Sequence, residues 1–561
     1  MSVGTCATLL ALCVTAVRGS VDEDKVLCLP RQAHLAYGDT VRHMVVMWST
    51  MQNCSTEVHY GSGPWNLDMT ASGKSIYFAE NNMGLQYIHR VILENLEPGI
   101  TYYYTPVSNS ISSGPFYFKM PPSGQDWSPE FMLYGDLGLH SESIPRLTAE
   151  ALKGEYTAVL HVGDFAYNLH DNINMENASD CTKTTQVGDA FMQMIQGMTS
   201  HVAYMTSPGN HEIDNDTFAH YRNRFSMPQS EWPIPLHQMW YSIDIGIVHF
   251  LSYSSETFFT SNGTYVNAQY EWIKQDLHVA NQNRDKCPWV IAFGHRPMYC
   301  SNNDGDDCTK TDSKVRKGFE DLFYEYGVDV VIQAHEHSYE RLWPMYKGVV
   351  LAKNYTNPTA PVQLITGAAG SKHGIDDFNN SNIADWSAFH IGNKSFNSYG
   401  RILVTNRTHL YWEQISVAGG QVLDSIWITQ TNHGPFDKAK LTSEVKEKID
   451  ESIKKEQIIT QANSKPKTTD TSVEKGDEGS IFNDITTRIA LGAGFGVLFL
   501  GFFATVCIVH RCKKKRSKNY RRWETLDYGR KFYNNVKNSE KDADDFESEV
   551  SDGTTKLLEK D

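Results

Sequence analysis

Short apolar runs alternate with helical stretches between residues 128 and 430, and this alternation constrains the fold more than any other feature of the chain. The apolar runs have strand length and include EFMLYGD, TAVLHVGD, WVIAFGH and VDVVIQAH. Helical stretches such as SIPRLTAEALK and SKVRKGFEDLFYEYG separate several of them. Strands that alternate with helices are typical of proteins in which helices cover layered sheets. We therefore predict a layered α/β domain over residues 128–430.

Residues 28–120 contain short runs rich in β-branched and aromatic residues, such as RHMVVMWST and TYYYTPVS. Gly, Pro, Asn or Ser interrupts these runs about every 10 residues, which is typical of β-sandwiches. The segment from Leu96 to Tyr104 is similar to the corner before a late strand in fibronectin type III domains. We predict a fibronectin III-like all-β domain over residues 28–120, with Trp48 in its core.

Two apolar segments near the ends of the chain predict its compartment. Residues 6–17 are apolar and small residues follow them, so residues 1–19 are predicted to be a signal peptide. The usual basic segment before such a run is missing, and a buried N-terminal strand is the alternative. Residues 489–509 carry no charge. A helix of that length spans about 31 Å, the thickness of a bilayer core, which favours a transmembrane helix over a buried core helix.

The residues that flank residues 489–509 indicate the orientation. Eight basic residues and no acidic ones lie between Arg511 and Arg522. Basic residues stay on the cytosolic side of a span, so residues 510–561 are predicted to be a cytoplasmic tail. Residues 432–485 are polar and are predicted to form a stalk, part of it helical. The chain is then a type I membrane protein with its α/β domain extracellular or lumenal, at the cell surface or in endosomes and lysosomes.

Sites for glycosylation and disulfide formation agree with an exported domain. Eight Asn-X-Ser/Thr sites all precede residues 489–509. Six cysteines lie between the two apolar segments, and Cys300 and Cys308 enclose a short polar loop. We predict that these two form a disulfide, with free buried thiols as the alternative. The formal net charge of −15, from 51 basic and 66 acidic residues, argues against a nucleic-acid partner.

Polar side chains come directly after the apolar strands of the α/β domain. These residues are Asp136, Asp164, Tyr167, Asn210, His211, His295, His335 and His337. The carboxyl ends of strands in a layered α/β fold meet at one edge, so residues far apart in sequence can converge there. Asp, Asn and His are metal ligands, and two metal ions about 3.5–4 Å apart need roughly this number of them. Each residue alone has a structural alternative, such as a turn or a helix cap.

Five blocks of the sequence resemble the motifs of purple acid phosphatases, which are calcineurin-like metallophosphoesterases. The blocks are GDLG (135–138), GDFAY (163–167), GNHE (209–212), FGH (293–295) and AHEH (334–337). The resemblance covers about residues 28–430 and is similar to the long, animal-type form. It implies an α/β/β/α sandwich and an active acid phosphatase that hydrolyses phosphate monoesters.

The resemblance also implies a role for each polar residue. An iron(III) ion would be held by Asp136, Asp164, Tyr167 and His337. Asp164 would bridge to a second ion, which is iron(II), zinc or manganese and is completed by Asn210, His295 and His335. Hydroxide activated by the two metals would attack phosphorus, with His211 donating to the leaving group or acting only as a support. The sequence departs from the family pattern at Ala334, where Gly is usual, and at Ala292, where Val is usual, but no ligand type is lost.

Other functions stay open from the sequence. A β-domain, a stalk and a tail with Tyr533 in a Tyr-X-X-Φ pattern also fit an inactive receptor or adhesion ectodomain with sorting adaptors on the tail. A nucleotide or diester metallophosphoesterase is another candidate. Gly492 and Gly496 form a GxxxG pattern in the predicted span, which is typical of helix dimers and predicts a homodimer unless these glycines face lipid.

Overall fold

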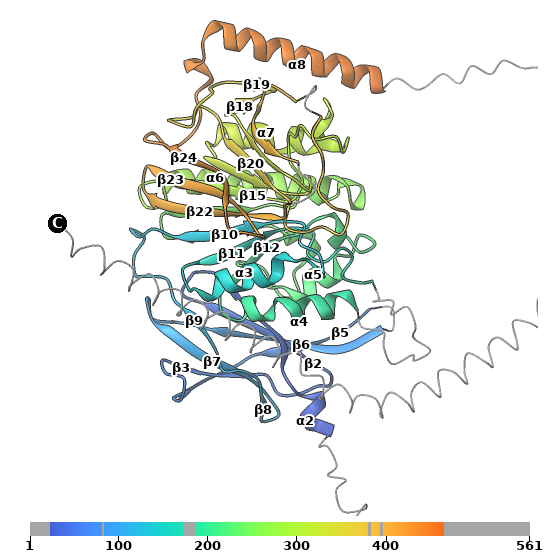
Figure 1. Ribbon diagram of the computed structural model, residues 1–561, viewed down its shortest axis with the longest axis vertical. Helices are drawn as coiled ribbons and strands as arrows, with labels where there is room; N and C mark the ends of the chain where they lie inside the picture. Colours follow the sequence, from blue (N-terminus) through green and yellow to red (C-terminus); the bar gives the residue numbers. More distant parts are fainter. Residues whose placement is uncertain (1–22, 81–82, 172–185, 380–382, 393–395, 465–561) are drawn as a thin grey trace, which may run out of the picture. The chain divides into compact units, whose positions relative to one another are not determined.

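The computed structural model describes residues 23–80, 83–171, 186–379, 383–392 and 396–464 (Figure 1). The predicted signal peptide, the predicted span over residues 489–509 and the predicted tail lie outside these residues. Within the described part of the chain, no helix is both long and apolar enough to cross a membrane.

The N-terminal region is all-β, as predicted, apart from the short helix α2 (Glu23–Leu27). Its strands are β1 (Arg31–Tyr37), β2 (Met44–Thr50), β3 (Glu57–Gly61), β4 (Met69–Ser72), β5 (Lys74–Glu80), β6 (Met83–Leu93), β7 (Thr101–Ser108), β8 (Ile111–Ser112) and β9 (Phe116–Lys119). One sheet has the order β4-β3-β7-β8 with β9 beside β7, and β1, β2, β6 and β5 pair in a second sheet. Trp48 is buried as predicted, and its Nε1 donates a hydrogen bond to Ser108 Oγ at 3.0 Å.

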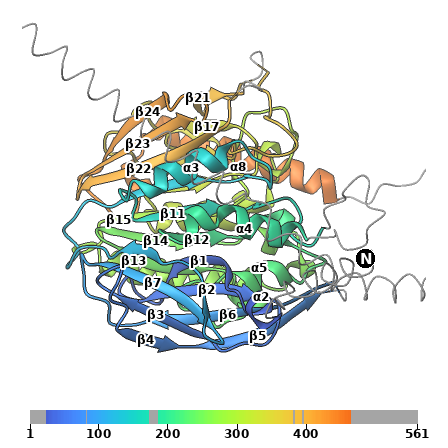
Figure 2. The same cartoon turned by 60° about the horizontal axis from the view of Figure 1, so that its bottom comes forward.

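The second of these N-terminal sheets continues into the α/β domain. β1 pairs in parallel with β12 (Ala203–Ser207), with Leu35 opposite Ala203. A single sheet with the order β24-β23-β22-β10-β11-β12-β1-β2-β6-β5 therefore runs through both predicted regions (Figure 2). The backbone ladder joins the regions directly, so the chain segment between residues 120 and 128 is not their sole connection.

The α/β domain contains two large sheets. The ten-stranded sheet receives β10 (Glu130–Tyr134), β11 (Ala158–Val162), β12, β22 (Ser398–Asn406), β23 (His409–Ser416) and β24 (Val422–Thr429). The other has the order β13-β14-β15-β16-β20-β17-β21. Its strands are β13 (Tyr241–Ile245), β14 (Val248–Ser252), β15 (Trp289–Phe293), β16 (Val330–Gln333), β20 (Val362–Thr366), β17 (Tyr339–Leu342) and β21 (Ser387–Ile391). Parallel pairing of β10, β11 and β12 in one sheet, and of β14, β15, β16 and β20 in the other, aligns their carboxyl ends.

The two sheets pack face to face, because alternate residues of each strand point to opposite sides. Phe131 of β10 contacts Phe250 of β14 with ring centroids 4.6 Å apart. Ile291 of β15 belongs to this shared core, whereas its neighbour Val290 belongs to the core under α6 (Val266–Gln282) and α7 (Lys314–Glu325). Helices α3 (Ser143–Leu152) and α4 (Val187–Thr199) pack on the ten-stranded sheet (Figure 1). The arrangement is an α/β/β/α sandwich.

The helical part of the predicted stalk packs on the α/β domain. Helix α8 (Ser443–Ser464) contains Ile449, which is buried beside Tyr324 and Tyr346. Short elements complete the chain: α5 (Ala219–Arg224), β18 (Met345–Tyr346), β19 (Val349–Val350) and the 3-10 helices η1 (Asn210–Glu212), η2 (Leu236–Gln238), η3 (Ser255–Phe258), η4 (Ser261–Gly263), η5 (Asp307–Thr309) and η6 (Lys438–Lys440).

Candidate metal centre

The loops after β10, β11, β12, β15 and β16 bring the predicted polar residues together at one edge of the sandwich. Four of these residues have a left-handed backbone, with φ of 59° at Asp136, 51° at Asp164, 57° at Tyr167 and 70° at His335. Such values cost roughly 1–3 kcal/mol each and occur mainly where function requires them. The strain concentrated at this edge therefore marks it as the functional site.

One cluster contains the residues predicted for the second metal. The His295 Nε2 atom lies 3.1 Å from Asn210 Oδ1, 3.4 Å from Asp164 Oδ1 and 3.1 Å from His335 Nδ1. Asp164, His295 and His335 each offer a ligand atom within 4.8 Å of the others. Four ligand atoms that face one another without bulky groups between them form a site of the size a cation needs.

The hydrogen bonds behind the two histidines of this cluster orient their rings. His295 Nδ1 lies 2.9 Å from the carbonyl oxygen of Val162, so this nitrogen donates and Nε2 keeps its lone pair. His335 Nε2 contacts the Asp306 carboxylate and lies 2.9 Å from Arg296 Nη1, and His335 Nδ1 faces His295. The inner nitrogens, His295 Nε2 and His335 Nδ1, therefore both face the cluster, as metal ligation requires.

The second cluster contains Asp136, Tyr167 and His337. The Tyr167 hydroxyl lies 3.1 Å from His337 Nε2, which is 3.5 Å from Asp136 Oδ1. Asp136 is fully buried, and within the described part of the chain its Oδ1 atom accepts no hydrogen bond and contacts only the His337 ring, at 3.5 Å. A buried carboxylate oxygen with so little compensation is costly unless a cation binds it, so this donor set fits a metal ion.

The protonation of both clusters also fits bound cations. Burial lowers the pKa of His295, but Asp164 and Asp136 outweigh it and raise the pKa to about 10. Burial also lowers the pKa of His337, and Asp136 reverses this to give about 9. Burial, together with Asp136, raises the pKa of Tyr167 far above its usual value. Bound cations would replace the protons on the histidines and favour the tyrosinate.

His211 lies at the open side of Asp164, where a substrate would enter. Its backbone N–H donates to Asp164 Oδ1 at 3.0 Å, and its Nε2 lies 3.8 Å from Asp164 Oδ2. Its Nδ1 is 2.8 Å from Asn168 Oδ1, which fixes the ring. The side chain is 25% exposed, so Nε2 can reach a bound ester oxygen.

The sequence did not reveal the role of Glu212, although it lies in the GNHE block. Its carboxylate is 1% exposed and accepts hydrogen bonds from the backbone N–H groups of Asp164 (2.9 Å), Phe165 (3.1 Å) and Gly209 (2.8 Å). Glu212 therefore ties the loop that carries Asp164 to the loop that carries Asn210. The contact joins two loops that are about 45 residues apart in sequence, so no short motif spacing in the sequence indicates it.

Two exposed residues after β20, Lys372 and His373, were also missed. The Lys372 Nζ atom lies 5.6 Å from the centroid of the Tyr167 ring. The His373 ring is 6.0 Å from His211 and 6.1 Å from His337 between centroids. They follow the GAAG segment, and their position adds donor groups at the rim of the centre.

Both departures from the family pattern fit the local packing. A Cβ added at Gly135 would lie 2.4 Å from Ala334 Cβ, so the methyl group of Ala334 is tolerated because Gly135 has none. Ala292 belongs to the core under α6 and α7, away from the ligands. A side chain at position 209 is excluded, because a Cβ added to Gly209 would lie 2.2 Å from Asp164 Oδ1.

The structure confirms the one disulfide that was predicted and adds a second. Cys300 and Cys308 form a disulfide as predicted, and Cys28 pairs with Cys54. Cys287 is a free buried thiol, and Cys181 lies outside the described residues.

Comparisons with known proteins agree with this geometry. Family models match for the purple acid phosphatase N-terminal domain over residues 30–120, for calcineurin-like phosphoesterase over 130–339 and for iron/zinc purple acid phosphatase-like protein C over 360–425. Acid phosphatase type 7 of Homo sapiens is 40% identical over 450 residues, which are 77% of this chain and 97% of the relative. A purple acid phosphatase of Glycine max is 29% identical and covers 73% of this chain and 87% of its own length.

A solved purple acid phosphatase from yellow lupin (Lupinus luteus) seeds shares the fold. Its TM-score is 0.59 at 23% identity, over 72% of this chain and 74% of the lupin chain. The matches confirm the predicted enzyme class, a phosphatase hydrolase with a binuclear metal site. The chain belongs to the purple acid phosphatase family.

Proposed function

We propose that this protein is an acid phosphatase for phosphate monoesters, with iron(III) bound by Asp136, Asp164, Tyr167 and His337. Asn210, His295 and His335 would hold a second divalent ion, iron(II), zinc or manganese, and Asp164 would serve as a ligand to both ions. The observation that carries the proposal is the contact between the two ligand clusters, where the His335 backbone N–H donates to Asp136 Oδ2 at 2.9 Å, with His211 beside Asp164. When bound, the two cations supply Lewis-acid charge and activate water at acidic pH.

His211 acts as the proton donor to the leaving group in this proposal. Burial lowers the pKa of His211, whereas Asp164 raises it, and the net direction is downward. The imidazole therefore carries a proton mainly at acidic pH, which agrees with acid phosphatase activity. Asn168 holds Nδ1 and leaves Nε2 directed at the open side.

The test of the catalytic assignment is H211A in purified full-length protein, with bound metal and turnover of p-nitrophenyl phosphate measured together. We expect kcat to fall by about 10²–10⁴-fold, the usual contribution of a general acid, with both metals retained. H211N, which keeps a polar side chain of similar reach, serves as a control for simple loss of packing. Unchanged kinetics in H211A would reject the role.

Colour provides a separate test of the iron(III) site. A tyrosinate bound to iron(III) absorbs visible light, so Y167F should lose this absorption while keeping its fold. Persistence of the absorption in Y167F would reject the assignment of Tyr167. Absence of metal and of activity in the unsubstituted protein would favour a receptor function instead.

The substrate class follows from a comparison of esters. Phosphate monoesters are expected to be hydrolysed much faster than bis(p-nitrophenyl) phosphate, and the reverse order would favour a diesterase. A relative from Allium cepa, 28% identical over 401 residues, is called phosphoenolpyruvate phosphatase. Phosphoenolpyruvate, a phosphate monoester, should therefore be one of the substrates tested.

We also propose a type I topology with the catalytic domain extracellular or lumenal. Six of the eight predicted glycosylation asparagines lie in the described residues and all six are exposed, which supports this orientation: Asn53, Asn215, Asn262, Asn354, Asn379 and Asn406. A glycosidase should increase the gel mobility of the protein from cells, and protease added to sealed vesicles should remove only residues 510–561. Loss of the catalytic domain under these conditions would reverse the topology.

A further inference from the structure

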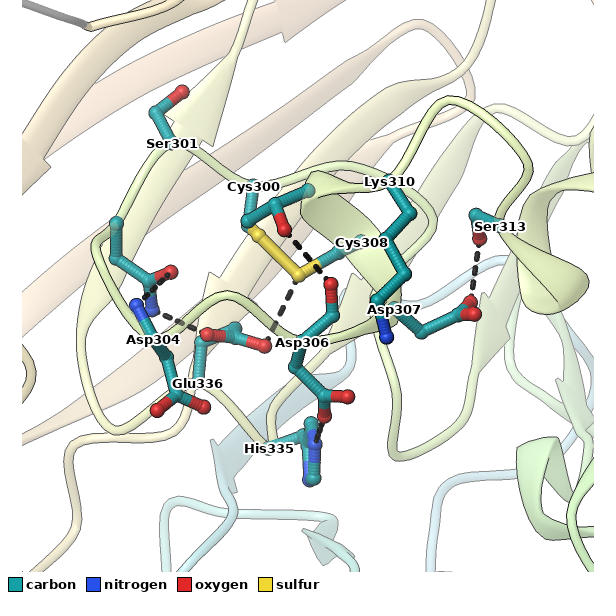
Figure 3. The surroundings of a disulfide bond; sticks show 12 residues. Cys300, Ser301, Asp304, Asp306, Asp307, Cys308, Lys310, Ser313, His335 and Glu336 are labelled. Atoms are coloured by element: carbon teal, nitrogen blue, oxygen red, sulfur yellow. Dashed lines mark hydrogen bonds and ion pairs between the residues drawn. A yellow bond between two sulfur atoms is a disulfide. The ribbon is translucent and has the colours of Figure 1, made fainter. Parts of the chain in front are cut away.

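A disulfide-closed loop contacts the proposed second metal site from outside. Cys300 and Cys308 are joined with their Cα atoms 5.4 Å apart, and Asp306 precedes Cys308 by two residues. Figure 3 shows the Asp306 carboxylate directed at the His335 ring, where it contacts Nε2. Asp306 therefore touches the nitrogen of His335 that faces away from the ligand cluster.

This contact determines which nitrogen of His335 is free to bind a metal. His335 Nδ1 lies 3.1 Å from His295 Nε2, inside the cluster. A carboxylate on the outer nitrogen fixes the rotation of the ring and therefore the direction in which Nδ1 points. Without Asp306, the ring can rotate and Nδ1 no longer faces the other ligand atoms.

Asp306 is itself held by an arginine whose side chain is 12% exposed. Arg296 Nη1 donates to Asp306 Oδ2 at 2.9 Å, and Arg296 Nε lies 2.9 Å and 3.1 Å from the two oxygens of buried Glu256. The Arg296 guanidinium also stacks at 4.5 Å from the centroid of the Phe259 ring. Its Nη1 atom lies 2.9 Å from His335 Nε2 as well, so Arg296 and Asp306 together hold the outer side of the His335 ring.

The rest of the loop fixes the position of the Asp306 backbone. The adjacent Asp307 turns the other way and accepts hydrogen bonds from Ser313 Oγ at 2.6 Å and Val315 N at 3.2 Å, at the start of α7 (Figure 3). On the other side, Glu336 contacts Asn302 and lies 3.0 Å from Cys308 Sγ. The loop is therefore anchored to α7 and to the His335–His337 segment.

We propose that Asp306 is a positioning residue for the divalent-metal half of the centre, where it holds His335 with its Nδ1 atom directed at the metal. The role rests on the proposed function, because it assigns His335 to the second metal. It concerns metal affinity first and turnover only as a consequence.

Metal binding by D306N tests this role directly. Full-length protein is purified in detergent, a chelator removes the divalent ion, and zinc is titrated back with binding measured by calorimetry. We expect D306N to bind zinc about 10–100-fold more weakly than the unsubstituted chain, as for other outer-shell substitutions. The visible absorption of the iron site and the circular dichroism should be unchanged, because the fold and the other cluster do not depend on Asp306.

The matched control is D304N, which removes the same charge from an exposed position of the same loop. D304N should bind zinc like the unsubstituted chain, and a loss equal to that of D306N would overturn the positioning role in favour of a general charge effect. Unweakened zinc binding by D306N would also overturn it. Failure of the unsubstituted chain to bind zinc would overturn the proposed second site, and with it the role of Asp306.

Discussion

Glu212 provides the sharpest test of how the metal-binding loops are held together. Its buried carboxylate accepts hydrogen bonds from three backbone N–H groups, those of Asp164, Phe165 and Gly209. Two of these bonds go to Oε2 and one to Oε1. E212A removes all three acceptors, whereas E212Q keeps one oxygen and places an amide group where the other was.

The expected losses differ between the two variants. A buried N–H group left without a partner costs about 1–3 kcal/mol. E212Q can turn its oxygen toward the two N–H groups that share Oε2, so one N–H is lost and the cost is about 1–3 kcal/mol. E212A leaves three N–H groups without this acceptor, which in full would cost about 3–9 kcal/mol. Burial and the Asp164 carboxylate raise the pKa of Glu212 to about 8, so E212A also removes an unfavourable contact between two carboxyl groups. We therefore expect a net cost of about 3–5 kcal/mol, at the lower end of that range.

Urea unfolding of the metal-free protein measures both costs without a contribution from bound ions. E271A is the matched control, because the Glu271 side chain is 70% exposed on α6, and it should change the free energy of unfolding by less than about 0.5 kcal/mol. Equal stability of E212A and the unsubstituted chain would refute the reasoning. So would E212Q being less stable than E212A, since the order follows from the number of acceptors lost.

Three further predictions concern other parts of the molecule. Burial lowers the pKa of His249, but two flanking carboxylates outweigh it and raise the pKa to about 9. H249Q should therefore lower the free energy of unfolding by about 2–3 kcal/mol at pH 6, measured by urea unfolding. This loss should shrink as the pH rises from about 6.5 to 9 and should be nearly absent at about pH 10. I449A should release α8, at a cost of about 2 kcal/mol, and limited proteolysis should then cleave within α8 faster than in the unsubstituted protein. The double variant C300A/C308A should loosen the loop of Asp306 and weaken zinc binding in calorimetry, and wild-type affinity would show that the anchors to α7 suffice.

The sequence predicted the features that depend on local pattern. Each polar residue directly after an apolar strand could be placed at a sheet edge, because strand ends converge in α/β folds. Asp164, His295 and His335 were expected together on this ground, and they lie within ligand distance of one another. The disulfide between Cys300 and Cys308 was predicted for a similar reason, since a short polar loop separates the two residues.

Features that depend on contacts between distant segments could not be predicted. Nothing near Glu212 or Asp306 distinguishes these carboxylates from the many exposed ones, because their roles arise only when separate loops meet. The pairing of Leu35 with Ala203, which continues one sheet across both regions, lacks a sequence signal for the same reason. Part of residues 432–485 was predicted to be helical, but the sequence did not show which surface Ile449 covers.

Backbone strain explains why this centre needs more than its seven proposed ligands. Left-handed φ values at Asp136, Asp164, Tyr167 and His335 cost roughly 1–3 kcal/mol each, or about 4–12 kcal/mol together. That sum approaches the net stability of an entire domain, about 5–15 kcal/mol. The hydrogen bonds that Glu212 accepts, one of them from Asp164 itself, hold the strained loop in place before any metal binds. Removing such a support should therefore let Asp164 relax toward ordinary φ values, so the protein loses metal affinity at a milder perturbation than the one that unfolds it.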